Sequence, residues 1–128
     1  MIQHDSPIRL RGMAWNHSRG YTPMVGPAQR FSELNPGVKV VWAKRSLQEF
    51  ADQSIEALAM RYDLLMIDHP WAGSAAAKEL LLQMDEHLPA EFLADQAANS
   101  VGALHRSCCF DGHRWTLAID AAAPVACW

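Results

Sequence analysis

The amino-acid sequence predicts an α/β fold in which helices flank a mostly parallel sheet. Three segments with the pattern of strands, at residues 8–13, 38–42 and 62–67, alternate with two segments of helical periodicity. A β-α-β-α-β order predicts parallel strands joined by right-handed crossovers. The length of 128 residues, taken alone, fits one domain.

The first strand and helix are predicted from alternation and from terminal signals. Residues 8–13 alternate apolar and charged side chains, as in a strand with one buried face. Thr22 is the expected N-cap and Pro23 the expected first helical residue. The helix should end at the turn formed by residues 35–37. Its apolar side is expected to contain Met24, Val25, Ala28 and Phe31.

A capping box predicts the second helix. Ser46 and Glu49 stand three residues apart ahead of an apolar run, and the helix is expected to end near Arg61. The strand at residues 62–67 is almost continuously apolar, which is typical of a strand covered on both faces. The buried side of the helix is expected to contain Leu47, Phe50, Ala51, Ile55 and Leu58.

The second half of the chain is less regular. A short helix is expected over residues 72–82, and residues 80–84 fit either its end or a strand. A further helix is expected over residues 89–98. Its inward side should contain Leu88, Phe92, Leu93 and Ala97.

The clearest local signal in this half is a hairpin. Asp111 and Gly112 are typical of a two-residue turn, in which both central positions need a positive φ. Residues 109–110 and 113–115 form the predicted arms, and residues 117–120 continue the second arm. Another strand is expected to begin at residues 125–128.

Composition indicates a soluble globular protein and excludes several classes. The formal net charge of −3 argues against a nucleic-acid partner, which usually needs an excess of Lys and Arg. We find no uncharged apolar run of the roughly 18 residues that span a bilayer. Three cysteines, with Cys108 next to Cys109, do not suggest a disulfide framework. The first residues lack the pattern of a signal peptide.

The candidate ligand site lies in the loops that follow the first and third strands. In an open parallel sheet, ligands bind beyond the carboxyl ends of the strands, where the strand order reverses. If the order is 2-1-3, both loops open on the same edge. Their rings and polar groups suit a neutral polar ligand. The candidate residues are Trp15, Asn16, His17, Arg19, Tyr21, Asp68, His69 and Trp71.

Signals for metal binding, cofactor binding and catalysis are weak. The six histidines form no H-E-x-x-H motif, and the cysteines form no C-x-x-C motif. The sequence also lacks G-x-S-x-G, G-x-G-x-x-G and Walker patterns. We therefore expect no metal, no cofactor and no catalytic residue.

Four segments in the same order resemble family 1 extracellular solute-binding proteins, the ligand receptors of ABC importers. Residues 10–17 (LRGMAWNH) resemble the family's first strand and binding loop, and residues 31–40 (FSELNPGVKV) its approach to the second strand. Residues 62–68 (YDLLMID) are similar to its third strand. Residues 110–120 (FDGHRWTLAID) are similar to the hairpin that precedes the second lobe.

The resemblance implies a type II periplasmic-binding fold, in which two α/β lobes close on a ligand and perform no chemistry on it. Family members are more than twice this length, so the chain is expected to be a truncated N-terminal lobe. Residues 1–7 would be a tail, residues 8–120 the lobe, and residues 121–128 the start of a crossover toward a second lobe.

For the site, the resemblance favours a carbohydrate-like ligand that is passed to an ABC permease. Trp15 and Trp71 would stack on the ligand. The expected location is periplasmic or extracellular, although a chain without a leader would stay in the cytoplasm. The expected hydrogen-bonding residues are Asn16, His17 and Asp68, with Arg19 and Asp120 as further candidates.

Two other classes of function remain open from the sequence. The chain could be the effector-binding domain of a transcriptional regulator, in which case a helix-turn-helix would adjoin it. It could also be a small α/β enzyme that uses His69 and Asp68 as a base pair.

Overall fold

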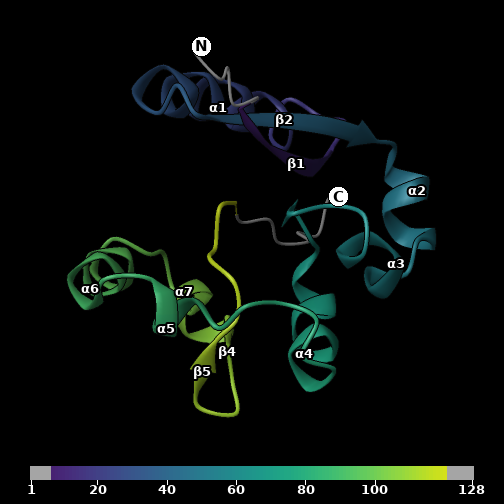
Figure 1. Cartoon of the computed structure of the whole chain (residues 1–128). Helices are drawn as coiled ribbons and strands as arrows, with labels where there is room; N and C mark the ends of the chain where they lie inside the picture. Colours follow the sequence, from purple (N-terminus) through teal and green to yellow (C-terminus); the bar gives the residue numbers. More distant parts are fainter. Residues whose placement is uncertain (1–6, 121–128) are drawn as a thin grey trace, which may run out of the picture. The chain divides into compact units, whose positions relative to one another are not determined.

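The computed structural model describes residues 7–120, with the side chains of Phe50 and Ala51 left out (Figure 1). The chain divides into two compact units, one ending at Asp68 and one beginning at His69. The predicted tail before Pro7, and the predicted crossover and strand after Asp120, lie outside the described residues. The same holds for the predicted inward positions of Phe50 and Ala51.

The first unit contains three strands and three helices. In chain order they are β1 (Ile8–Trp15), α1 (Thr22–Leu34), β2 (Val38–Arg45), α2 (Leu47–Asp52), α3 (Ile55–Ala59) and β3 (Leu64–Leu65). Figure 1 shows α1 beside β1 and β2, and α2 following the carboxyl end of β2.

The predicted parallel sheet is confirmed, and its strand order is β2-β1-β3. The central strand β1 pairs in parallel with β2 from Ile8↔Val38 to Trp15↔Arg45, and with β3 at Gly12↔Leu64 and Met13↔Leu65. The ladder therefore extends β1 two residues beyond its predicted end and β2 three residues beyond its predicted end.

Gly12 allows the central strand and an indole ring to approach closely. A Cβ atom at Gly12 would lie 2.4 Å from Cε3 of Trp42, its partner in the register. No side chain larger than hydrogen fits there without displacing the ring. The buried apolar residues of this unit are Met13, Ala14, Ile55 and Leu58.

The helix α1 lies where it was predicted, but its start and its apolar side differ from the prediction. Tyr21 is the N-cap, without a side-chain cap hydrogen bond, so Thr22 and Pro23 both lie within the first turn. Val25 and Phe31 are 41% and 44% exposed, so the predicted apolar side is covered only in part.

The predicted second helix is two helices. The capping box is confirmed, because Ser46 Oγ accepts the Glu49 N–H at 3.2 Å and Glu49 Oε2 accepts the Ser46 N–H at 2.8 Å. The chain becomes extended at Gln53, and Ser54 Oγ accepts the Ala57 N–H at 3.2 Å. This second cap starts α3, and the prediction of one continuous helix was wrong because it overlooked Ser54.

The third strand is shorter than predicted. Only Leu64 and Leu65 form the ladder, although the Asp63 and Met66 N–H groups donate to the carbonyls of Arg11 and Met13 at 2.8 and 2.9 Å. Leu64 is 39% exposed, so the expected burial on both faces was wrong at that position.

The second unit contains four helices and a hairpin. Its elements are α4 (His69–Ala77), α5 (Met84–His87), α6 (Ala90–Ala98), α7 (Leu104–Ser107), β4 (Cys109–Phe110) and β5 (His113–Arg114). Its buried apolar residues are Ala72, Ala75, Ala76, Cys108 and Trp115. None of the helices described in the chain is long and apolar enough to cross a membrane.

Several boundaries and faces in this unit differ from the predictions. Helix α4 begins three residues earlier and ends five residues earlier than expected, and Glu79, with φ of 53°, lies beyond its end. Residues 80–83 form neither helix nor strand. Helix α6 agrees with its prediction, but Phe92 is 40% exposed and Ala97 is exposed, so the inward side was wrong for these two residues.

The predicted hairpin is confirmed. Strands β4 and β5 pair antiparallel, and Asp111 and Gly112 have φ values of 51° and 82°, as a type I′ turn requires. Its second arm ends at Arg114, so the predicted continuation at residues 117–120 was wrong. Asp85 holds this arm, because its Oδ1 accepts the Arg114 N–H at 2.7 Å and its Oδ2 lies 3.0 Å from His113 Nδ1.

Candidate ligand-binding site

The end of β1 and the loop after it carry five of the predicted site residues, and the loop is folded back by its own backbone. The carbonyl of His17 accepts the N–H groups of Gly20 and Tyr21 at 3.0 and 2.9 Å, and the His17 N–H donates to the Trp15 carbonyl at 2.8 Å. A Cβ at Gly20 would lie 2.6 Å from that same carbonyl oxygen. These contacts define the conformation of the loop.

Two predicted site residues form a stacked ring pair. The ring centroids of Trp15 and His17 lie 4.2 Å apart, and the ring planes differ by 8°. The Arg19 N–H donates to His17 Nδ1 at 3.1 Å. His17 is exposed, whereas Trp15 is half-buried.

The remaining residues of this loop are placed by β2. The Asn16 N–H donates to the Arg45 carbonyl at 2.8 Å, so the loop leaves the sheet beside the end of β2. Tyr21 is half-buried, and Lys44 Nζ lies 4.8 Å from the centroid of its ring. This is the geometry of a cation–π contact, and it ties the end of the loop to β2.

Sequence reasoning missed Arg45, which lies at this same edge of the sheet. It ends β2 opposite Trp15 and is only 5% exposed. Burial lowers the pKa of Arg45, while the negative charges of Asp68 and Glu49 raise it in part. A buried guanidinium is retained where charged partners compensate its loss of water. Residues 42–45 (WAKR) do not alternate between apolar and charged side chains, so no local pattern places Arg45 in the strand.

Asp68 therefore shares this edge with the loop after β1, as expected for a central β1. It follows β3 and is exposed, and its charge acts on Arg45. Glu49 differs from Asp68 because its Oε2 already accepts hydrogen bonds from the N–H and Oγ of Ser46. Asp68 itself is exposed at this edge.

The other three predicted site residues belong to the second unit. The His69 ring donates through Nε2 to the Ser107 carbonyl at 2.9 Å, which joins the start of α4 to the end of α7. Trp71 lies in α4 and is 40% exposed. Asp120 is exposed and ends the described part of the chain.

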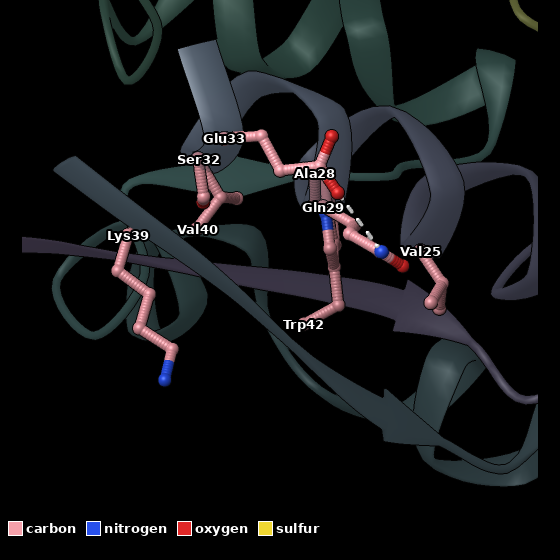
Figure 2. A pocket seen from close by; sticks show the side chains of 8 residues that line it. All are labelled: Val25, Ala28, Gln29, Ser32, Glu33, Lys39, Val40 and Trp42. Atoms are coloured by element: carbon pink, nitrogen blue, oxygen red, sulfur yellow. Dashed lines mark hydrogen bonds between the residues drawn. The ribbon is translucent and has the colours of Figure 1, made fainter. Parts of the chain in front are cut away.

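The first unit also has a groove that the sequence did not predict. Figure 2 shows it between α1 and β2. Its volume is about 460 Å³. It lies near the start and middle of β2, away from the edge that carries His17 and Arg45. The Ser32 hydroxyl in this region is buried and has no hydrogen-bond partner among the described residues. The lining residues are Val25, Ala28, Gln29, Ser32, Glu33, Lys39, Val40 and Trp42.

The described residues contain two free thiols and no metal-binding cluster. Between residues 7 and 120, no group of three or more His, Cys, Asp or Glu side chains is arranged to hold a metal ion. Cys108 and Cys109 are free thiols, and Arg114 Nη2 donates to Cys109 Sγ at 3.1 Å.

Comparison with protein-family models and with curated proteins found no match to this chain. The structure itself shows the type of fold and no family. The chain contains a small α/β domain with a three-stranded parallel sheet, flanked by helices, together with a small antiparallel hairpin.

Proposed function

We propose that this chain is the N-terminal lobe of a solute receptor that captures a carbohydrate-like ligand for an ABC import permease. The main support is the carboxyl edge of the β2-β1-β3 sheet. That edge carries the Trp15–His17 ring pair, and the charges of Arg45 and Asp68 lie beside it. Rings and fixed polar groups together suit a sugar, which has apolar ring faces and a rim of hydroxyls.

The order of the sequence motifs gives independent support. The segments that resemble solute-binding proteins include β1 with its loop, the approach to β2, and β3 with Asp68. In such a receptor the ligand is held and released unchanged, so this proposal includes no catalytic residue. The location that goes with it is periplasmic or extracellular.

Titration calorimetry and NMR titration of the 128-residue chain test this proposal. The probes are glucose, galactose, maltose and cellobiose, and the same titrations apply to any longer chain that its coding sequence encodes. We expect saturable binding of at least one sugar and a loss of about tenfold or more in affinity for Asp68→Asn, as for a hydrogen bond to a charged group. His87→Ala, on α5, is the matched control. If neither the 128-residue chain nor a longer encoded chain binds any of these sugars, the receptor proposal is refuted.

The geometry gives less support to a small enzyme. A base at His69 would act through Nδ1, because its Nε2–H donates to the Ser107 carbonyl. Among the described residues, His69 makes no hydrogen bond with Asp68, which was its expected partner. The regulator alternative shares the same ligand edge. Sequence-dependent DNA binding by the longest encoded chain would favour the regulator over the receptor.

A further inference from the structure

The stacked ring pair limits which aromatic face a ligand can reach. His17 covers one face of the Trp15 indole at a centroid separation of 4.2 Å, which is van der Waals contact and leaves no space for a third ring. Trp15 is half-buried, whereas His17 is exposed. The imidazole is therefore the more exposed ring of the pair.

The hydrogen bond from Arg19 determines where the imidazole carries its proton. Nδ1 of His17 accepts the Arg19 N–H at 3.1 Å, so Nδ1 holds a lone pair. A neutral imidazole with an accepting Nδ1 carries its proton on Nε2, which is then a donor. The backbone hydrogen bonds from Gly20 and Tyr21 to the His17 carbonyl keep the residue in place.

We propose that His17, rather than Trp15, is the ring on which the ligand stacks, and that its Nε2–H donates to an oxygen of the ligand. This inference rests on the proposed receptor function and specifies its ligand contact. Trp15 supports the imidazole from behind. The ligand that fits is a neutral molecule with a flat apolar face and an acceptor oxygen at its rim, as in a pyranose.

NMR of the 15N-histidine-labelled chain tests the proton position without any ligand. The long-range 15N–1H pattern of His17 should show the proton on Nε2, and this pattern should persist in the His87→Ala control. A proton on Nδ1 would overturn the inference, because the ring would then present no donor to the ligand.

Three variants separate the ring from the donor in sugar titrations with glucose, galactose, maltose and cellobiose. His17→Phe keeps a ring without a donor, and His17→Gln keeps an N–H donor without a ring. Each should lose about threefold to tenfold in affinity, as expected for one stacking contact or one hydrogen bond. His17→Ala should lose about tenfold to a hundredfold. Circular dichroism checks that each variant is folded, and the two conservative variants carry the test if His17→Ala is not.

The outcomes distinguish this inference from the proposed function. Sugar binding that is unchanged in all three His17 variants overturns the His17 contact and leaves the receptor standing. A wild-type chain, in any form, that binds none of the sugars overturns the receptor and the contact together. Losses in affinity that are smaller for His17→Phe and His17→Gln than for His17→Ala support both the receptor and the His17 contact.

Discussion

At the scale of single residues, the first unit depends on one very close approach. Gly12 lies on the central strand, and the ring of Trp42 occupies the space that a side chain would need. The same ring lines the groove against α1 (Figure 2). Gly12 therefore affects how β2 packs against both β1 and α1.

Replacement of Gly12 should destabilise the first unit. In Gly12→Ala the new methyl group would overlap the indole, and overpacking of this kind costs about 1–3 kcal/mol. Urea unfolding measures the effect. Gly37→Ala is the control, because a Cβ there meets no atom within 4 Å, and its change should stay below about 0.5 kcal/mol. Equal effects of the two substitutions would contradict the packing described for Gly12.

At the scale of elements, side-chain caps decide where α2 and α3 begin. Ser46 and Glu49 cap α2 reciprocally, and the pKa of Glu49 is lowered by its hydrogen bonds from the Ser46 N–H and hydroxyl. Ser54 caps α3 in the same segment, which is why one predicted helix became two.

Removal of the first cap should weaken α2. Ser46→Ala leaves the Glu49 N–H without its acceptor, which costs about 1 kcal/mol for a typical N-cap. Chemical unfolding followed by circular dichroism measures this loss. Ser18→Ala, at an exposed loop position, should change stability little by comparison. A Ser46→Ala chain as stable as wild type would show that the cap does not hold α2.

The hairpin depends on pH through Asp85. The Arg114 N–H, and then the His113 ring, lower the pKa of Asp85 in the folded chain. Such a carboxylate stabilises the fold above its unfolded pKa of about 3.9, and this stabilisation disappears as the pH falls through the folded pKa. Wild type should therefore be more stable than Asp85→Asn at pH 6, and urea midpoints should converge in acid. A difference that is constant with pH would contradict the role of the charge.

The sequence predicted the parallel sheet and the hairpin because strong local patterns define them, whereas the order β2-β1-β3 was only assumed for the site and comes from the structure. Alternation in β1 and the Asp111–Gly112 turn are examples. It did not predict the Trp15–His17 stack or the burial of Arg45, since both depend on where β1 and β2 end. Strand ends are fixed by pairing between segments far apart in sequence, which local patterns do not contain.

At the scale of the whole molecule, the chain is organised as two compact units. Each has its own buried residues, such as Ile55 in the first and Trp115 in the second. Proteins often open locally in separate cooperative units. Damage to one unit is therefore expected to stay within it.

Hydrogen exchange with mass spectrometry can test this confinement. Gly12→Ala should increase exchange in β1 and β2 while the amides of Arg114 and Trp115 keep their wild-type protection. Asp85→Asn, measured at pH 6, should show the reverse pattern. Increased exchange in both units for either variant would mean that the two unfold cooperatively.

The ladder of β2 has a consequence for self-association. β2 bonds to β1 on one side, and in the part of the chain that the structure describes no strand pairs with its other side. Such an edge strand can recruit a strand from another molecule, and lysines are a common protection against this. Lys39 and Lys44 are both exposed on β2. A Lys39→Val, Lys44→Val double variant should therefore aggregate faster than wild type in light-scattering measurements, and a Lys39→Arg, Lys44→Arg control should not.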